Sequence, residues 1–326
     1  MLRSNIYLTD VNPKIGNGLN HQLWCIVDAL MIGEYASRNI MVTGLYPDYD
    51  SRIKLNLSNI IDIDRTNDEL QKHGFSARLL PYDSEIPWTT TAYTNPVFNK
   101  FVSMEPNVRF YKMIEALEAE SHIRYVNLWT TFVWPFMAPY GNVIELHQKA
   151  IQVFKCLTPS PMIRFIVNQR LKQLKSDYYV VHLRLEDDWI RFITQDYKNN
   201  IHYGKTEEDC TRDIYNDIVS LIDQHMPGDN EIYIATGLNN GENKNKYILD
   251  ELKEKYPNRL AFKDGKTCEW SEIFPGFDPC REIEGYIDLH VCLHGKIFIG
   301  SVMSSFSTSL KYCYDIENKP VYQYNG

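Results

Sequence analysis

YYVVHLRLEDDW (residues 178–189) has the apolar run of a buried strand, yet polar or charged side chains interrupt it at every second position. Alternate residues of a strand share a face, so His182, Arg184 and Glu186 point together, while the leucines between them point into the opposite layer. The pattern predicts a strand of a parallel sheet whose charged face and carboxyl end border a ligand.

The alternation of elements around this strand predicts a doubly wound α/β fold. Helical runs alternate with short strand-like runs through the second half of the chain, which is typical of a parallel sheet. We expect helices over 162–174, 211–224, 246–256, 281–294 and 304–314, and strands over 178–185, 231–236, 259–262 and 296–300.

The first half of the chain opens with the same type of unit. We expect strands over 5–11, 39–45 and 123–132, and helices over 21–38, 109–120 and 143–157. Residues 46–94 give no clear pattern. Two prolines in TPSP (158–161) disfavour a continuing helix, so we predict one domain over 1–157 and a second over 158–326.

The composition argues against a nucleic-acid or membrane partner. With 34 basic and 42 acidic residues, the 326-residue chain has a net charge of −8, so no overall basic field attracts a nucleic acid or an anionic membrane. We find no apolar run of about 18 residues that would span a bilayer, and no signal peptide. Seven scattered cysteines favour reduced thiols. We therefore expect a cytoplasmic protein, in the host cytoplasm if it is viral.

Arg184 stands where the strand ends, and two roles fit it. Its guanidinium offers a planar fork of donors that matches a phosphate or carboxylate, with a charge that is fixed at any working pH. Alternatively, it forms an internal ion pair with Glu186 or another carboxylate, as folded proteins also do. The residues alone leave both interpretations open.

A further anion site is predicted at the start of the last helix. The strand-like IFIG (297–300) leads through small residues to Ser304, Ser305 and Ser307. A helix N-terminus presents unpaired N–H groups and the positive end of its dipole, and serine hydroxyls add donors. The alternative is a serine that only caps the helix, which accounts for one of the three.

KIGNGLNHQ (14–22) is a glycine-rich turn between the first strand and the first helix. It fits neither the GxGxxG dinucleotide motif nor the GxxxxGK[ST] phosphate loop. Gly16 and Gly18 allow the backbone to approach a ligand closely, and Asn20 and His21 supply polar side chains. Taken alone, a plain turn with a helix cap is the simpler interpretation.

Two metal motifs are weighed and set aside. Cys280, His290, Cys292 and His294 lie close in sequence, but their spacing does not match paired zinc ligands, and on a helix Cys292 points away from the histidines. DID (62–64) resembles a metal-binding Asp-x-Asp, a pattern that occurs often by chance. We predict no metal.

Together these stretches resemble the GDP-fucose-dependent protein O-fucosyltransferase superfamily. GNGLN (16–20) is similar to its G-x-G-[LF]-N turn, and HLRLEDDW (182–189) to its H-L-R-x-x-x-D-W strand end. YIDLHVCLHGKIFIGSVMSSFS (286–307) resembles its V-D-L…F-I-G-x-x-x-S-S-F-[ST] segment, and IYIATG (232–237) stands where the family has a strand ending in A-T-D. The resemblance implies a GT-B-like fold, in which two Rossmann-like domains with parallel sheets face each other across a cleft. The N-terminal domain is then the acceptor side, and the C-terminal domain binds the nucleotide sugar.

The resemblance also implies a role for each matching residue. Arg184 holds the β-phosphate and the leaving oxygen as the glycosidic bond breaks, which stabilises a developing anion. Asn20 faces the donor sugar and the acceptor. His182 and Asp188 line the nucleoside, and Asp288 accepts hydrogen bonds from the guanine edge. The pyrophosphate cradle and part of the base pocket consist of Ser304, Ser305, Phe306 and Ser307.

The chain departs from the family at two positions that bear on the chemistry. One branch has a catalytic Glu where this chain has Asn17, which cannot take a proton; the other branch lacks that Glu and works through a highly dissociative route. Glu186 and Asp187 are the first candidates for the base that activates an acceptor hydroxyl, and His21 is the third. Gly237 in place of the Asp of A-T-D removes an acid near the nucleoside.

We therefore predict an inverting, metal-independent glycosyltransferase that moves a sugar, foremost fucose from GDP-fucose, to a hydroxyl of a glycan or protein. Beyond this nucleotide-sugar donor it needs no cofactor, because Arg184 and the helix N-terminus neutralise the phosphates. UDP-xylose is the alternative donor, and a non-catalytic nucleotide- or glycan-binding protein is the alternative outside the class. The lack of the family's secretory features suggests a microbial or viral enzyme that acts on a glycan or a coat protein.

Overall fold

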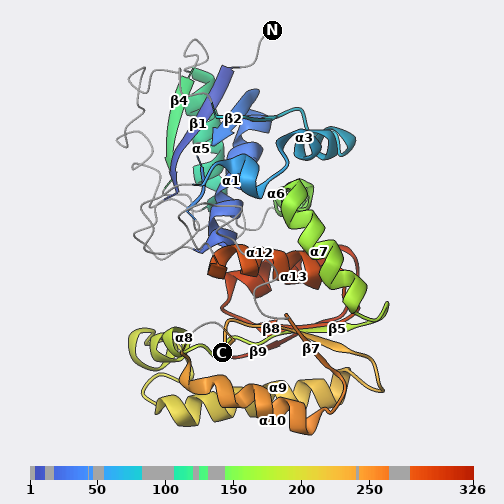
Figure 1. Ribbon diagram of the computed structural model, residues 1–326. Coiled ribbons are helices and arrows are strands. Elements are labelled where there is room, and N and C mark those ends of the chain that lie inside the picture. Colours follow the sequence, from blue (N-terminus) through green and yellow to red (C-terminus); the bar gives the residue numbers. More distant parts are fainter. Residues whose placement is uncertain are drawn as a thin grey trace. The chain divides into compact units, whose positions relative to one another are not determined.

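The computed structural model (Figure 1) describes residues 4–11, 18–42, 44–46, 55–82, 106–119, 125–130, 144–239, 242–263 and 280–326. The chain divides into two compact units, Met1–Ile163 and Arg164–Gly326. The division falls inside helix α7 (Pro161–Gln173), which begins at the second proline of TPSP. Each unit has a parallel sheet of its own.

In its described residues, the first unit contains a four-stranded sheet in the order β3-β2-β1-β4. Its strands are β1 (Ser4–Val11), β2 (Arg38–Val42), β3 (Leu79–Leu80) and β4 (Tyr125–Thr130). Its helices are α1 (Leu19–Tyr35), α2 (Leu57–Ile60), α3 (Ile63–Lys72), α5 (Pro106–Ala119) and α6 (Ile144–Cys156). Helix α1 packs on β2, α5 and α6, and Trp24 of α1 stacks on Phe154 of α6 with ring centroids 4.8 Å apart.

Helix α1 ends earlier than its apolar pattern predicts. It stops at Tyr35 instead of Arg38, because Ser37 adopts a left-handed conformation with a φ of 55° and turns the chain toward β2. Arg38 opens β2, is buried, and donates a hydrogen bond to the Leu117 carbonyl at 2.9 Å. Residues 46–94, which gave no clear pattern, contain α2, α3 and β3.

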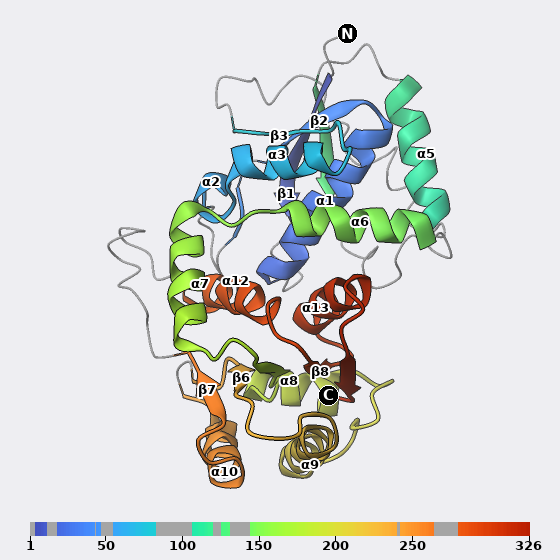
Figure 2. The ribbon, with the colours of Figure 1, turned by 90° about the vertical axis from the view of Figure 1, so that its right-hand side faces the viewer.

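The described part of the second unit contains a five-stranded parallel sheet in the order β7-β6-β5-β8-β9. Its strands are β5 (Tyr179–His182), β6 (Ile232–Ala235), β7 (Leu260–Phe262), β8 (Phe298–Ser301) and β9 (Val321–Tyr324). Figures 1 and 2 show helices α9 (Glu207–His225) and α10 (Tyr247–Lys255) on one face of the sheet, and α12 (Cys280–Cys292) and α13 (Ser305–Ile316) on the other. The strand order reverses between β5 and β8, and a ligand crevice in such a sheet lies at the carboxyl ends of those strands.

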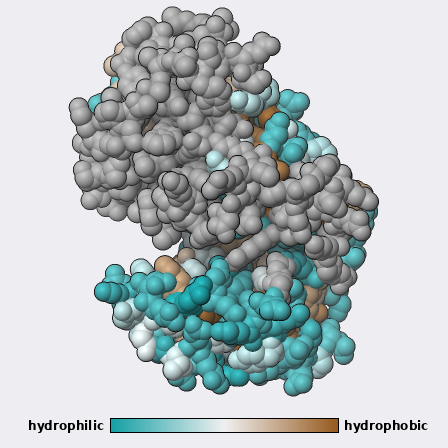
Figure 3. Space-filling view, turned by 60° about the vertical axis from the view of Figure 1, so that its left-hand side comes forward, coloured by the Kyte–Doolittle hydropathy of each residue, from teal (hydrophilic) through white to brown (hydrophobic). Residues whose placement is uncertain are grey.

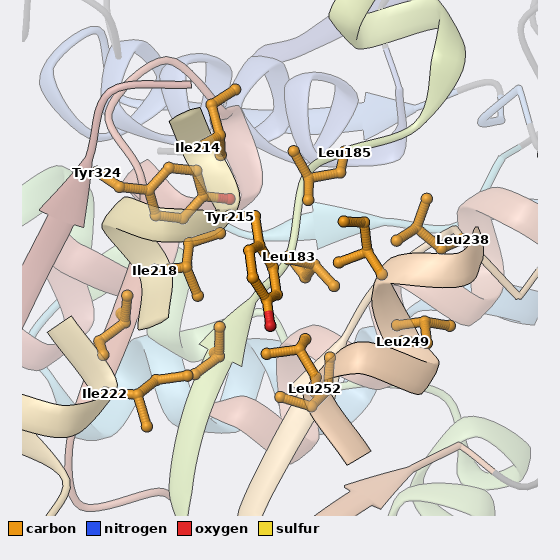
Figure 4. Close-up of a cluster of buried hydrophobic side chains, with 14 of the residues drawn as sticks. Leu183, Leu185, Ile214, Tyr215, Ile218, Ile222, Leu238, Leu249, Leu252 and Tyr324 are labelled. Atoms are coloured by element: carbon orange, nitrogen blue, oxygen red, sulfur yellow. The ribbon is translucent and has the colours of Figure 1, made fainter. Parts of the chain in front are cut away.

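The apolar side of β5 and of the residues that follow it, up to Leu185, packs into the core of the second unit. Val181, Leu183 and Leu185 are fully buried, and Figure 4 shows the two leucines among side chains of α9 and α10. Burial of each such side chain is worth about 1.5–3 kcal/mol. The predicted apolar face is therefore confirmed, and it orients His182 and Arg184 toward the other side.

Two features of the second unit differ from the expected pattern. Strand β5 ends at His182 rather than Leu185, since its ladder with β6 stops at Ala235. It is followed by helix α8 (Asp187–Arg191) and the π-helical turn η2 (Phe192–Asp196). The sheet also contains β9 after α13, where the sequence pattern predicted no further strand. VYQY (321–324) was missed because it is only four residues long and mostly half-buried.

The described surface on the face in Figure 3 is mainly hydrophilic. Of the large apolar side chains whose exposure the structure describes, the most exposed come from separate segments, and they are Ile144, Phe165 and Ile201. Among the described residues, no helix has the length and apolar character needed to cross a membrane.

Candidate functional site

The carboxyl ends of β5 and β8 bring together two distant parts of the sequence. Nδ1 of His182 lies 2.8 Å from Oγ of Ser307, and the His182 ring lies against Phe306 with centroids 4.4 Å apart. The N–H of Ser301 donates to the same Ser307 oxygen at 3.0 Å. HLRLEDDW and the SSFS segment therefore form one site, at the reversal point of the strand order.

The imidazole of His182 is held in its neutral form. Burial, with a smaller contribution from the Arg184 charge, lowers its pKa from 6.5 to about 3. Because Ser307 Oγ already accepts from Ser301, its own proton is available for Nδ1. We assign the ring proton to Nε2, which makes His182 a hydrogen-bond donor.

Arg184 is fixed on several sides and stays partly open. Its Nη1 lies 2.8 Å from Oε2 of Glu186, and its Nη2 lies 3.7 Å from Oδ2 of Asp188. The guanidinium also lies over the Trp189 ring, 5.3 Å from the centroid. The side chain of Arg184 is 22% exposed. The internal ion pair that was one interpretation of Arg184 is thus present, and the exposure leaves room for a ligand as well.

Tyr324 holds the backbone on either side of Leu183, a role that the sequence pattern missed. Its hydroxyl accepts a hydrogen bond from the Arg184 N–H at 2.9 Å and donates one to the His182 carbonyl at 2.8 Å. The residue is buried, and its ring belongs to the cluster in Figure 4. Burial raises its pKa well above the usual range, so the hydroxyl keeps its proton.

The two acids proposed as bases both have partners on neighbouring segments. Glu186 is buried, and its Oε1 accepts a hydrogen bond from the Gly237 N–H at 2.7 Å. Asp187 accepts from the Lys244 N–H, at 3.2 Å and 3.1 Å to its two oxygens, and from the Asn245 side chain at 3.3 Å. Asp187 therefore anchors the start of the 3-10 turn η3 (Lys244–Lys246).

The start of α13 has the features of an anion site. Ser304 occupies the N-cap position, but its side chain makes no capping hydrogen bond. The N–H groups of Ser305, Phe306 and Ser307 fall in the first turn, where a helix offers them no acceptor. Ser307 itself is turned toward His182, so the backbone rather than three serine hydroxyls supplies most of the donors.

Asp288 lies in a buried charge network on α12. Its Oδ1 accepts from Arg170 Nη1 at 2.7 Å and from the Tyr233 hydroxyl at 2.6 Å, and Arg170 also pairs with Glu284. All four side chains are buried. The predicted contact between Asp288 and a guanine edge remains a prediction. In the structure the carboxylate links α12, on which it lies, to Arg170 of α7 and Tyr233 of β6.

The residues predicted in the first unit stand at the start of α1. Gly18 is the N-cap with a φ of −57°, so its backbone conformation does not itself require glycine. The buried Oδ1 of Asn20 has no hydrogen-bond partner in the described part of the chain. Burial lowers the pKa of His21 from 6.5 to about 4. Gly16 and Asn17 lie outside the described residues.

The metal motifs find no support among the described residues. No group of three or more His, Cys, Asp or Glu side chains there is arranged to hold a metal ion. Asp62 of DID instead caps helix α3 by accepting from the Arg65 N–H at 3.1 Å. Cys292 is fully buried on α12, and burial raises its pKa well above the usual value.

Comparison with known proteins agrees with this geometry. A family model described as GDP-fucose protein O-fucosyltransferase matches residues 48–314. No curated protein is similar enough to match.

Several solved structures share the fold. POFUT1 in complex with GDP-fucose has a TM-score of 0.61 and 13% sequence identity, over 99% of both chains. NodZ α-1,6-fucosyltransferase soaked with GDP-fucose has a TM-score of 0.58 and 11% identity, over 98% of this chain and 97% of that one. For fucosyltransferase NodZ from Bradyrhizobium the values are 0.56 and 11%, over 96% and 92%. The α/β, GT-B-like fold predicted from the sequence is confirmed.

Proposed function

The chain belongs to the GDP-fucose protein O-fucosyltransferase family and is a fucosyltransferase-like glycosyltransferase, and from this premise we propose that it transfers fucose from GDP-fucose to a hydroxyl group. The acceptor is a glycan or a protein, and the transfer inverts the configuration at the anomeric carbon. POFUT1 and NodZ, which share the fold, have structures with GDP-fucose. That shared fold supports the donor assignment for this chain.

The observation that carries the proposal is the position of Arg184 and the α13 N-terminus at the ends of adjacent strands. Both provide positive charge, one as a guanidinium and the other as unpaired N–H groups. The ion pair with Glu186 and the Trp189 ring orient the guanidinium. A diphosphate that spans the two donors would be bound by the guanidinium and the helix start together.

In the proposed mechanism, the acceptor oxygen forms its bond to the anomeric carbon as the bond from that carbon to the phosphate oxygen breaks. Negative charge develops on the departing diphosphate, and Arg184 and the α13 N-terminus stabilise it. The acceptor proton goes to a base, for which the sequence offered Glu186, Asp187 and His21. Because protein groups supply the positive charge, the reaction requires no divalent metal.

Nucleotide binding provides the first test. We expect GDP to raise the melting temperature of the protein more than UDP, ADP or CMP do, since a ligand that binds only the folded state stabilises it. Radiolabelled GDP-fucose should be hydrolysed slowly in the absence of an acceptor. UDP-xylose serves as the competing donor. Stabilisation by none of the four nucleotides would overturn the proposal.

The role of Arg184 needs a substitution that keeps the protein folded. Removal of the whole side chain would leave Glu186 as a buried unpaired charge, so we choose Arg184→Lys, which keeps the charge but not the fork. We expect weaker GDP binding and slower hydrolysis. Arg212→Lys is the matched control, because Arg212 pairs with Glu251 on the surface of the same unit at 2.6 Å. Equal activity of the two variants would contradict the assignment.

A reducing compartment such as the cytoplasm is our proposal for where the protein works. Four cysteines in the described ranges support it, because they are free and buried: Cys25, Cys156, Cys210 and Cys292. Alkylation of the protein taken from its native source, followed by mass spectrometry, should find these thiols reduced. Disulfides among them would contradict the proposal.

A further inference from the structure

The carboxylate of Glu186 links the carboxyl ends of two neighbouring strands. Its Oε1 accepts a hydrogen bond from the Gly237 N–H, just after β6, at 2.7 Å. Its Oε2 lies 2.8 Å from Nη1 of Arg184, just after β5. Glu186 is only 5% exposed, so both interactions form in an environment of low polarity.

The space for this carboxylate exists because residue 237 has no side chain. A Cβ atom at position 237 would stand 2.5 Å from Glu186 Oε1, 3.2 Å from its Cδ and 3.3 Å from its Cγ. Gly237 is not among the described glycines with positive φ, so its backbone conformation does not explain the glycine. Gly237 is therefore a glycine for reasons of space, and its N–H holds the group that fills the space.

We propose that Glu186 is a positioning residue for Arg184 rather than the base, and that Glu186 and Gly237 form one structural unit for that purpose. The inference rests on the proposed function, because Arg184 acts on the donor phosphates. Glu186 holds Nη1, Asp188 approaches Nη2 and Trp189 covers one face of the guanidinium. The arrangement fixes the direction of the fork before a donor binds, which is the condition for strong stabilisation of a developing charge.

The same contacts make Glu186 a poor choice for the base. A general base needs a lone pair within hydrogen-bond reach of the acceptor hydroxyl. Here one carboxylate oxygen accepts from a backbone N–H. The other is an ion-pair partner of the guanidinium without accepting a hydrogen bond in the described residues, and burial of the side chain keeps an acceptor hydroxyl away from it. Glu186, which the sequence analysis listed as a candidate base, therefore acts by positioning Arg184.

The first test observes Arg184 without any ligand. In NMR spectra of the protein with ¹⁵N-labelled arginine, we expect the Arg184 Nη groups to give separate signals, because a held guanidinium rotates slowly. Glu186→Gln keeps an oxygen that accepts from the Gly237 N–H but removes the negative charge that pairs with Arg184. In this variant the separate Arg184 signals should merge. Glu251→Gln, which removes the partner of the surface residue Arg212, is the control and should leave Arg184 unchanged. Separate Arg184 signals in Glu186→Gln would overturn the proposal.

The second test separates positioning from proton transfer in the reaction. For Glu186→Gln we expect GDP affinity and kcat to fall together, each by roughly ten- to a hundredfold, with the shape of the pH–rate profile unchanged. Loss of a base would instead lower kcat by about 10²–10⁴-fold, leave GDP affinity intact and remove the acidic limb of the profile. That second result would assign the base to Glu186 and refute the positioning role.

The third test exchanges the acid between the strands. Gly237→Asp alone should reduce GDP binding, since its Cβ displaces the Glu186 carboxylate. Glu186→Ala vacates that space, so the double variant Glu186→Ala/Gly237→Asp should regain GDP affinity relative to either single variant. Losses that simply add would overturn the pairing. A wild-type protein that binds no GDP would refute the proposed function, and the NMR result would still decide whether Glu186 holds Arg184.

Discussion

The hydroxyl of Tyr324 accepts a hydrogen bond from the backbone N–H of Arg184 at 2.9 Å. The same hydroxyl donates to the His182 carbonyl at 2.8 Å. Strand β5 ends between these two residues, and Leu183 N–H still bonds to Ala235 at 2.9 Å. The Tyr324 side chain from β9 therefore provides hydrogen bonds for the His182 carbonyl and the Arg184 N–H, the backbone groups before and after Leu183.

We predict that Tyr324→Phe will weaken both stability and donor binding. The ring can still pack, but the half-buried Arg184 N–H and the buried His182 carbonyl lose this partner, which costs about 1–3 kcal/mol. The backbone that carries Arg184 loses its support at the same time. Urea unfolding and GDP titration measure the two effects. A variant with wild-type values in both would show that the hydroxyl is dispensable.

Ser307→Ala should lower stability and weaken nucleotide binding. Its hydroxyl bonds both His182 and the Ser301 N–H in a fully buried place, so its removal costs about 1–3 kcal/mol of unfolding free energy. Ser309→Ala is the matched control on the same helix, because Ser309 is equally buried and donates to the Ser305 carbonyl one turn back. We expect the control to bind GDP as the wild type does. Parallel losses in both variants would argue against a specific role of Ser307.

Asp187→Asn should leave the rate of donor hydrolysis nearly unchanged. The carboxylate accepts hydrogen bonds from Lys244 and Asn245, and an Asn side-chain oxygen can still accept from the Lys244 N–H. The loss of a general base would reduce the rate by about 10²–10⁴-fold. Steady-state kinetics thus tell an anchor from a base, and a reduction of that size would restore Asp187 as the base.

Stability should fall as the pH drops below 6.5, with His182 as one source. Its folded-state pKa is about 3, so between these values the unfolded chain takes up a proton that the folded chain does not. The free energy of unfolding then decreases by up to about 1.4 kcal/mol per pH unit for this group. His182→Asn should show a shallower decrease between pH 6 and pH 4 in urea unfolding. An unchanged slope would contradict a buried neutral His182.

Chelation should not affect the reaction. Since Arg184 and the α13 N-terminus supply the positive charge in the proposed mechanism, GDP-fucose hydrolysis in excess EDTA should equal that in magnesium. The same comparison with Arg184→Lys shows whether a metal replaces a weakened guanidinium. Loss of activity on chelation in the wild type would contradict the metal-independent route.

Much of the fold follows from local patterns. The alternation in 178–185 predicted which residues of this segment face the core, and Leu183 and Leu185, which follow β5, lie there. Such patterns reflect burial, which repeats along the chain with the period of the strand or helix. Strand β9 escaped prediction because its residues are mostly half-buried and give no alternation.

The site was predictable only where one segment contains it. Arg184 and the start of α13 were found because each follows a strand-like run of its own. Tyr324 and Gly237 were missed as partners, since they meet the 182–186 segment only through the order of the strands. Asp187 was expected among the reacting groups because it lies close to Arg184 in the sequence. Its contacts with Lys244 and Asn245, about sixty residues away in the chain, cannot be seen in the sequence.

The pairing of Glu186 with Gly237 also has a consequence for the comparison of sequences. A side chain at position 237 would compete with the Glu186 carboxylate for one space, so an alignment scored column by column would treat two dependent positions as independent. Relatives with glycine at the position of Gly237 should carry Glu at that of Glu186, and those with a side chain there should lack it. Substitutions at the two positions are therefore expected to be correlated, because they share one volume and one charge, and the two alignment columns have to be compared as a pair.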